Sequence, residues 1–168
     1  MSEHAHKDKH DAHRHLVDRL RQQANEVRRL TSGLDEEMLA KRIVPEKWSL
    51  KELVCHLHRV QEIFAGRVEA MLAEDNPAIA RYEPEGDAAF EKMAAKPAKD
   101  SLTGFLENRE RLAQRLAALT PAEWHRSGAH PEFPNYDLHF QVEYMTHHEA
   151  HHIYQMFQRR VPLGKLPH

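Results

Sequence analysis

The sequence predicts an all-α fold, a four-helix bundle with long connections between the second and third helices and between the third and fourth. Four segments repeat apolar residues at three- and four-residue steps, as amphipathic helices do. Two segments rich in turn-forming residues separate the last three of these helices. The sequence has no stretch in which apolar and polar residues alternate between turn signals, which is the pattern of a half-buried strand.

A chain of 168 residues can bury one substantial core but is too short for two ordinary domains. We expect a flexible, histidine-rich N-terminal arm at residues 1–10 and a single bundle domain at residues 11–168. The first fifteen residues contain five of the 15 histidines among charged neighbours, which favours a solvated arm or a ragged helix start over weak metal scavenging. These histidines are His4, His6, His10, His13 and His15.

The first expected helix covers about residues 11–30 and stops at Thr31-Ser32-Gly33. A short helical turn follows at residues 34–39. The apolar stripe of the first helix consists of Leu16, Leu20, Val27 and Leu30.

A capping box predicts the start of the second long helix. Ser49 is followed three residues later by Glu52, so each side chain can bond a backbone N–H at the helix start. Trp48, just before the cap, is placed to pack back on this helix, which we expect to reach about Leu72. Its stripe consists of Leu50, Leu53, Leu57, Val60, Phe64, Val68 and Met71.

The pattern then breaks into prolines and charges, which predicts a long connection with a short helix around residues 88–95. The third long helix is expected to start with Asp100 or Ser101 as its N-cap and to reach Thr120-Pro121. Its stripe consists of Leu102, Phe105, Leu106, Leu112, Leu116 and Leu119.

A second loop covers residues 124–137 and contains Gly128 and two prolines. Either Asn135 or Asp137 at its end can cap the fourth helix. That helix is expected to run to Phe157, because no proline or glycine interrupts it.

The charge pattern excludes some classes of function. The formal net charge is −2, and Lys and Arg are interspersed with Asp and Glu, so we expect no nucleic-acid binding. No stretch approaches the roughly 20 apolar residues of a membrane span, and the charged N-terminus does not resemble a secretory signal. The single cysteine, Cys55, cannot form an internal disulfide. We therefore expect a cytoplasmic protein without a membrane partner.

The fourth helix carries the chemistry that organises the rest of the chain. His148 and His152 are one turn apart, so both imidazoles can project from the inward side of the helix and reach one ion. His147 and His151 form a second pair at the same spacing, but they are rotated toward the polar side. A catalytic zinc-type site commonly has three protein ligands and an open position. The third ligand we expect is His56, at the flank of the apolar stripe of the second helix.

Residues 148–152 also match the H-E-x-x-H pattern of metallopeptidases. The match is weak in a chain rich in histidine, and no Asp or Glu follows Glu149 to supply the usual third ligand. Peptidase activity is therefore disfavoured. Glu149 falls on the inward face, where it can orient a ligand, carry a proton as a catalytic residue, or form a structural pair with an arginine such as Arg67 or Arg111.

These motifs resemble those of the DinB-like (DinB/YfiT) superfamily of bacterial four-helix bundles. The resemblance rests on residues 48–57, on Arg67 and on the C-terminal His-Glu-Ala-His-His-x-x-Gln, and the order of elements agrees over nearly the whole chain. It implies a metal-binding bundle whose three histidines are His56, His148 and His152. Residues 124–131 also resemble the family's tryptophan-to-His-Pro connection, whereas Phe133-Pro134-Asn135-Tyr136 departs from the glycine and threonine-rich turn common there.

Characterised members of this superfamily include S-transferases that use low-molecular-weight thiols such as bacillithiol, mycothiol or glutathione, and a mycothiol-dependent isomerase. The resemblance therefore implies a divalent-metal-dependent enzyme that takes a small-molecule thiol and an electrophile. The shared physics is that a free thiol is only slightly ionised at neutral pH, whereas binding to a dication deprotonates it. The alternatives are a metal-dependent hydrolase, a non-catalytic metal- or ligand-binding stress protein, and histidines without a metal.

The metal is left open by the sequence, since imidazole suits Zn, Ni and Fe alike. The residues we expect to line the cofactor pocket are Arg67, His130, Tyr154 and Gln155. A homodimer is compatible with the pairing of two-helix faces about a two-fold axis.

Overall fold

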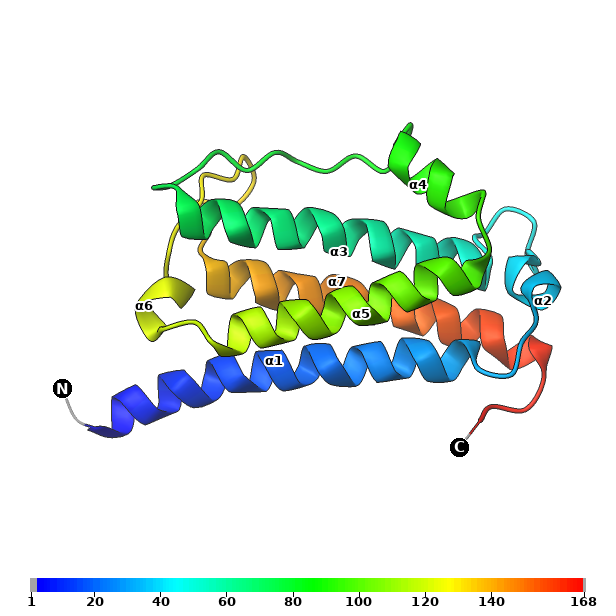
Figure 1. Cartoon of the computed structure of the whole chain (residues 1–168), viewed down its shortest axis with the longest axis horizontal. Coiled ribbons are helices and arrows are strands. Elements are labelled where there is room, and N and C mark those ends of the chain that lie inside the picture. Colours follow the sequence, from blue (N-terminus) through cyan, green and yellow to red (C-terminus); the bar gives the residue numbers. More distant parts are fainter. Residues whose placement is uncertain (1–2, 168) are drawn as a thin grey trace.

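The computed structural model describes the backbone of residues 3–167 and the side chains from residue 11 to residue 167. It confirms the four-helix bundle (Figure 1). Among the described residues, the extended structure is confined to two isolated β-bridges. The helices are α1 (Glu3–Thr31), α2 (Glu36–Ala40), α3 (Leu50–Ala73), α4 (Ala88–Ala94), α5 (Ala98–Ala117), α6 (Pro121–Trp124), α7 (Leu138–Arg160) and the 3₁₀ turn η1 (Val161–Leu163).

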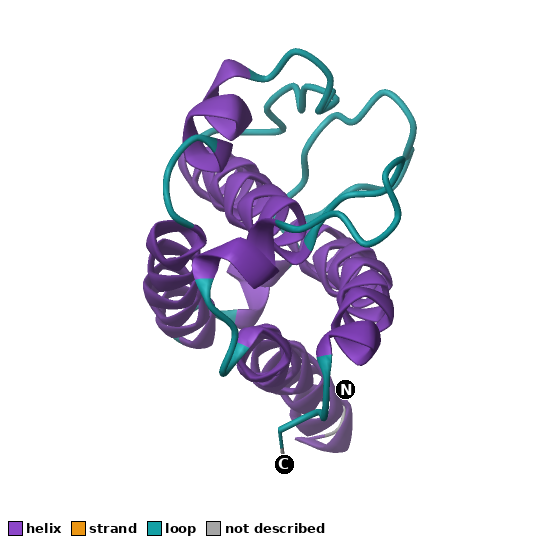
Figure 2. Cartoon of the chain, turned by 90° about the vertical axis from the view of Figure 1, so that its right-hand side faces the viewer, coloured by secondary structure: helices purple, strands orange, loops and turns teal. Residues whose placement is uncertain are grey.

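The order of the helices in the bundle explains the long connection after α3. Helices α1 and α3 each pack against both α5 and α7, so α1 lies diagonally opposite α3 (Figure 2). Figure 1 shows that α3 and α5 run in the same direction, whereas α1 and α7 run the other way. Because α3 and α5 are parallel neighbours, the chain must return along the bundle between them, as in other bundles with a crossover connection.

Several of the predicted helix ends are confirmed, whereas α5 ends at Ala117, before Thr120, and α7 continues to Arg160, beyond Phe157. Helix α1 stops at Thr31, and Gly33 follows with a φ of 76°, a conformation that favours glycine. The capping box of Ser49 and Glu52 is formed at the start of α3, and Asp137 caps α7 by accepting from the backbone N–H of Phe140 at 2.8 Å.

Helix α5 begins at Ala98, earlier than the predicted N-cap at Asp100 or Ser101. Its first backbone N–H groups are capped from another helix: Glu36 of α2 accepts from Ala98 at 2.8 Å and from Lys99 at 3.1 Å. A helix start that depends on a residue so distant in the chain leaves no local signal.

Helix α1 also begins earlier than predicted, at Glu3, so the backbone of residues 3–10 continues the helix. The side chains of the expected histidine-rich arm lie outside the described residues. Of the two expectations for these histidines, the solvated arm does not hold for His13, because it lies within α1, its side chain is only 4% exposed and its ring stacks on Trp124 of α6 at 4.5 Å. The packing of α6 against α1 buries it.

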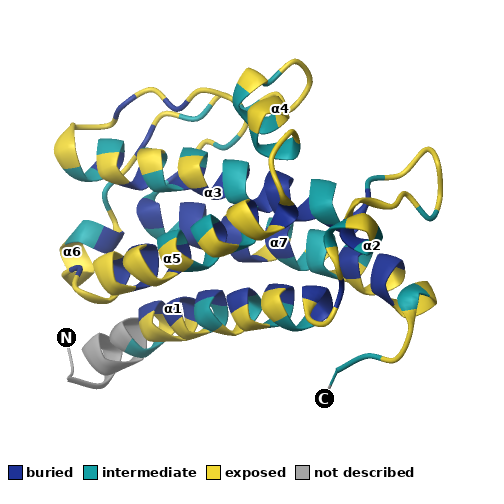
Figure 3. Cartoon of the chain, turned by 45° about the vertical axis from the view of Figure 1, so that its right-hand side comes forward, coloured by how far each residue is buried: buried dark blue, intermediate teal, exposed yellow. Residues whose placement is uncertain are grey.

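The apolar core consists of two clusters along the bundle axis. A layer of buried polar side chains separates them and contains Gln61 of α3, Arg109 of α5 and Glu149 of α7. On α1, Leu20 belongs to one cluster and Ala24 to the other. Figure 3 shows that the buried residues of the long helices face inward and their exposed residues outward. None of the helices in the described part of the chain is long and apolar enough to cross a lipid bilayer.

The connection after α3 and the loop before α7 lie against one another beside the bundle (Figure 2). The backbone N–H of Ile79 donates to Ala129 at 2.8 Å, and that of Ala129 donates to Pro77 at 2.8 Å. Gly128 is required at this crossing, because a Cβ atom there would lie 2.9 Å from Cγ1 of Ile79. The two loops together form one wall over the groove between α3 and α7.

Candidate metal centre

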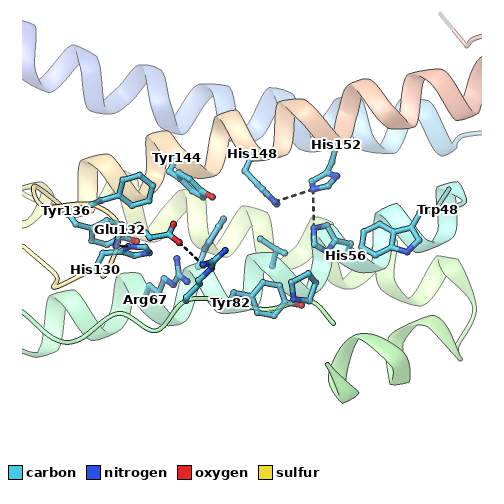
Figure 4. Close-up of a pocket in the computed structure, with 15 residues that line it drawn as sticks. Trp48, His56, Arg67, Tyr82, His130, Glu132, Tyr136, Tyr144, His148 and His152 are labelled. Atoms are coloured by element: carbon cyan, nitrogen blue, oxygen red, sulfur yellow. Dashed lines mark hydrogen bonds and ion pairs between the residues drawn. The ribbon is translucent and has the colours of Figure 1, made fainter. Parts of the chain in front are cut away.

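Three imidazoles from two helices converge on one point between α3 and α7 (Figure 4). Nε2 of His152 lies 3.1 Å from Nε2 of His56 and 3.2 Å from Nε2 of His148. The three ligand atoms all lie within 4.8 Å of one another. The structure thus brings together the three histidines that helical spacing and the family resemblance predicted as ligands.

Helix geometry explains this convergence. His148 and His152 are one turn apart on α7 and face α3, which packs directly against α7. His56 meets them from α3 and is 5% exposed. His147 and His151 are exposed, as their rotation toward the polar side predicted.

The three rings are uncharged at neutral pH. Burial, with a smaller effect of the neighbouring imidazoles, lowers the pKa of His56 to about 3 and that of His148 to about 4. Burial also lowers the pKa of His152, although its hydrogen bond to Gln155 acts in the opposite direction. A neutral imidazole is the form that coordinates a metal ion, so these nitrogens fit a divalent cation.

Gln155 fixes which nitrogen of His152 faces the centre. Nδ1 of His152 donates to Oε1 of Gln155 at 2.8 Å, which leaves the lone pair on Nε2 directed toward the other two histidines. A partner on the outer ring nitrogen is the usual way in which proteins orient a metal-binding histidine. The expected pocket residue Gln155 therefore acts on the centre through His152.

A cavity of about 360 Å³ opens beside the three histidines, between α3, α7 and the two loops (Figure 4). Its walls are largely aromatic, and they include Trp48, Phe64, Tyr82, Phe133, Tyr136 and Tyr144. Arg67 and His130, both predicted as pocket residues, line this cavity. The centre is therefore next to a space that can hold a small organic molecule.

Tyr154 does not line the cavity, in contrast to the prediction. Its side chain is 60% exposed. Position 154 follows His152 by two residues, which is a rotation of roughly 200° around the helix, so the phenol faces away from the centre.

Glu149 is also absent from the cavity wall. Its carboxylate forms a buried ion pair with both terminal nitrogens of Arg109, one of them at 2.8 Å. The structure thus forms the pair with an arginine that the sequence allowed, but the arginine is neither Arg67 nor Arg111, which were named as examples. Arg109 is 1% exposed and reaches Glu149 from α5 through the interior of the bundle.

Several cavity residues were not predicted from the sequence. Phe64 lies eight residues after His56 on α3, and Tyr144 lies four residues before His148 on α7, so helical spacing contained the signal for both. Arg81 and Tyr136 are on the two loops, where no periodicity applies. Tyr136 and Phe133 come from the segment that departs from the family's usual turn, so this departure lies in the cavity wall.

Comparisons with known proteins agree with this architecture. YuaE of Bacillus subtilis (strain 168), an uncharacterized protein, is 26% identical to the chain over 137 residues, which are 74% of this chain and 84% of YuaE. The structure of YfiT from Bacillus subtilis, described as a probable metal-dependent hydrolase with an unusual four-helix bundle topology, matches with a TM-score of 0.77 at 20% identity. The match covers 98% of this chain and 90% of YfiT.

The family model of the DinB superfamily matches residues 19–156. The matched range contains His56, His148 and His152 and most of the four long helices. The chain therefore belongs to the DinB superfamily.

Proposed function

We propose that His56, His148 and His152 hold a divalent metal ion and that the protein is a metal-dependent enzyme, a thiol-dependent S-transferase that joins a small-molecule thiol to an electrophile. The observation that carries the proposal is the convergence of three neutral imidazole nitrogens beside a cavity of about 360 Å³. Three histidine ligands leave a coordination position for a substrate. When bound, the ion supplies a positive charge that lowers the pKa of a coordinated thiol or water.

The residues of the chain have distinct roles in this proposal. The three histidines hold the ion, and Gln155 keeps the ring of His152 oriented. The aromatic walls present apolar surface next to the centre and would exclude water once a substrate fills the cavity. A thiolate in a desolvated site is a stronger nucleophile than one exposed to water, because its hydration shell has been removed.

The pattern of carboxylates favours a thiol over water as the nucleophile. Glu132 is the one carboxylate among the described cavity residues, and it is paired with Arg81 at 2.9 Å. Glu149 is held by Arg109. Attack by water commonly requires a base that takes up a proton, whereas a thiol would release its proton to solvent on binding and then attack as a thiolate without a base.

A metal-dependent hydrolase is the second candidate. It is favoured by the structural similarity to YfiT, which is described as a probable enzyme of that class. The same three histidines would serve it, since a metal-bound water reaches a pKa of about 7 in other histidine-ligated sites. Among the described residues that line the cavity, His130 is the one imidazole outside the centre, and it lies at the opposite end.

Metal content tests the centre itself. The untagged protein, purified without a metal column, should contain about one equivalent of a divalent metal by mass spectrometry. The double variant His148→Ala/His152→Ala should lose it. The matched control His147→Ala/His151→Ala removes a pair at the same spacing on the same helix and should keep it. Equal metal content in the two double variants would contradict the proposed site and assign the metal to other histidines of the chain.

Turnover separates the two reactions. The metal-loaded protein should consume a low-molecular-weight thiol in the presence of an aryl halide electrophile, and the His56→Ala variant should not. Hydrolysis of ester and amide substrates without any thiol would identify the second candidate instead. A metal-loaded protein that performs neither reaction would point to a binding protein with the same centre.

A further inference from the structure

The cavity has two chemically different ends. Figure 4 shows the three histidines at one end and Arg67, His130 and Tyr136 at the other. His56 and Arg67 are eleven residues apart on α3, roughly 16 Å of helix at 1.5 Å per residue. Phe64 and Tyr144 line the space between the ends, and Figure 4 shows Tyr144 between the histidines and Tyr136.

The far end presents hydrogen-bond donors. Nδ1 of His130 accepts from the backbone N–H of Glu132 at 3.0 Å, so the neutral ring carries its proton on Nε2. One terminal nitrogen of Arg67 donates to the carbonyl of Ala80 at 2.7 Å, which anchors the guanidinium and leaves its other N–H groups for a ligand. The combination of a guanidinium, an imidazole N–H and a phenol suits an acceptor with several lone pairs.

Tyr136 gives independent support. The residue is 3% exposed, and its hydroxyl is buried close to the guanidinium of Arg67, which opposes the rise in the pKa of Tyr136 that burial causes. A phenol beside a cation can donate its proton to an anion that the cation also binds. The ring stacks on His130 at 5.0 Å, so the hydroxyl is held at the same end of the cavity as the other two donors.

The charge balance indicates what this end binds. Arg67 and Arg81 are the cations that line the cavity, and Glu132 is the anion, so the formal charge is two minus one, or +1, with the histidines neutral. Arg81 is already paired with Glu132 at 2.9 Å and with Glu83 at 3.2 Å. The uncompensated charge is therefore that of Arg67, which matches a single carboxylate better than a doubly charged phosphate.

We propose that Arg67, Tyr136 and His130 form a carboxylate subsite, so that the cavity takes a small molecule with an apolar body and an anionic end far from the histidines. The proposal rests on the proposed function and names the class of ligand for that site. Arg67 provides the charge, and the two neutral donors fix the orientation of the carboxylate. The aromatic walls contact the apolar body and place its other end at the centre.

A series of two-ended probes tests the subsite. Each ω-mercaptoalkanoic acid, from three to eleven carbons, is compared with the mercaptoalkanol of the same length on cobalt-loaded protein, with thiolate–cobalt absorption as the readout. At the length that spans the cavity, the acid should bind about tenfold or more tightly than the alcohol, the usual strength of hydrogen bonds to a charged group. Equal affinities at every length would overturn the proposal.

Variants locate the effect. Arg67→Gln should abolish the preference for the acid, and Tyr136→Phe, which keeps the ring stack, should reduce it. The matched control Arg115→Gln removes one positive charge on α5 outside the cavity and should leave the preference intact. A preference that survives in Arg67→Gln would place the carboxylate elsewhere.

A measurement without metal keeps this test separate from the proposed function. Hexanoate is titrated into metal-free protein and followed by the amide NMR signals of residues 128–136. Binding that is lost in Arg67→Gln would support the subsite even if cobalt did not bind, in which case only the metal centre would fail. Hexanoate binding of equal strength in Arg67→Gln, or no binding to the wild type, would overturn the subsite whatever the metal result.

Discussion

At the scale of single residues, Gln155 determines how well the histidine centre is prepared for an ion. Its Oε1 holds Nδ1 of His152 at 2.8 Å, and Nε2 of His152 is the atom within hydrogen-bond distance of both other ligands. Without this hydrogen bond, the ring of His152 can rotate or change tautomer. Metal binding would then have to fix the ring again, and this cost would weaken the affinity for the metal.

We expect Gln155→Ala to weaken metal affinity by about 10- to 100-fold, the usual effect of removing a partner of a metal-binding histidine. Competition with a chelating indicator dye measures the affinity directly. Gln158→Ala is the matched control, because Gln158 is exposed on the same helix and should leave the affinity unchanged. Equal affinities of the two variants would show that His152 is held by packing alone.

The role of a residue could be predicted from the sequence where the pattern of its own helix indicated it. His148 and His152 needed only the repeat of one helix, and His56 needed the apolar stripe of another. Arg109 had a signal that was not used: it follows Phe105 by four residues and precedes Leu112 by three, so it lies on the buried stripe of α5. Tyr136 had none, because the loop around it is shaped by contacts with the connection after α3.

At the scale of elements, the connection that covers the cavity is tied to the bundle at Asp87. Its carboxylate caps α4 and accepts from the hydroxyl of Tyr82 at 2.7 Å and from Nε of Arg59 on α3 at 2.8 Å. Burial by itself raises the pKa of Asp87, but the hydrogen bonds from Tyr82 and Arg59 outweigh it, so the pKa is lower than usual. This carboxylate therefore holds the wall of the cavity in its charged form.

An acid whose pKa is lower in the folded protein than in the unfolded chain stabilises the folded state at any pH above the unfolded-state pKa. This stabilisation is lost as the pH falls through the pKa of the folded state. The connection at residues 74–94 should therefore open as pH falls below about 4. Hydrogen exchange of this segment, corrected for intrinsic rates, measures the opening. Asp87→Asn should show it already at pH 7, whereas Asp75→Asn, in the exposed part of the same connection, should behave like the wild type. Identical exchange in Asp87→Asn and the wild type would contradict this role.

The helix starts illustrate the same limit at this scale. The starts of α3 and α7 were predicted because Ser49 and Asp137 cap their own helices. The start of α5 was not, because Glu36 caps it from α2. No local sequence pattern indicated that α3 and α5 are parallel neighbours. The length of the connection between them was predicted.

At the scale of the whole molecule, one arginine joins all four long helices. Arg109 of α5 donates to Gln61 of α3 at 2.5 Å, to the carbonyl of Leu20 in α1 at 2.8 Å, and to Glu149 of α7. These contacts form the polar layer between the two apolar clusters, so they fix the alignment of the helices along the bundle axis. The histidine centre depends on that alignment, because its ligands come from α3 and α7.

Arg109→Met should lower the free energy of unfolding by about 3–5 kcal/mol, because Glu149 would remain buried without a partner. The double variant Arg109→Met/Glu149→Leu should regain most of this loss, since a buried ion pair and well-packed apolar residues are often similar in stability. Urea unfolding measures both. Arg115→Met is the matched control, because Arg115 of α5 forms an exposed ion pair with Glu69 of α3. It should lower the free energy of unfolding by less than about 1 kcal/mol.

The same double variant decides the role of Glu149. If its carboxylate only joins the helices, the folded double variant should keep its metal and its turnover, because Glu149 does not line the cavity. If the double variant instead lost turnover but kept its metal and its stability, Glu149 would be a proton carrier. The sequence allowed this role, because Glu149 follows His148 on the inward face of the helix. The ion pair with Arg109 favours the first outcome, because the guanidinium occupies both carboxylate oxygens of Glu149 inside the bundle.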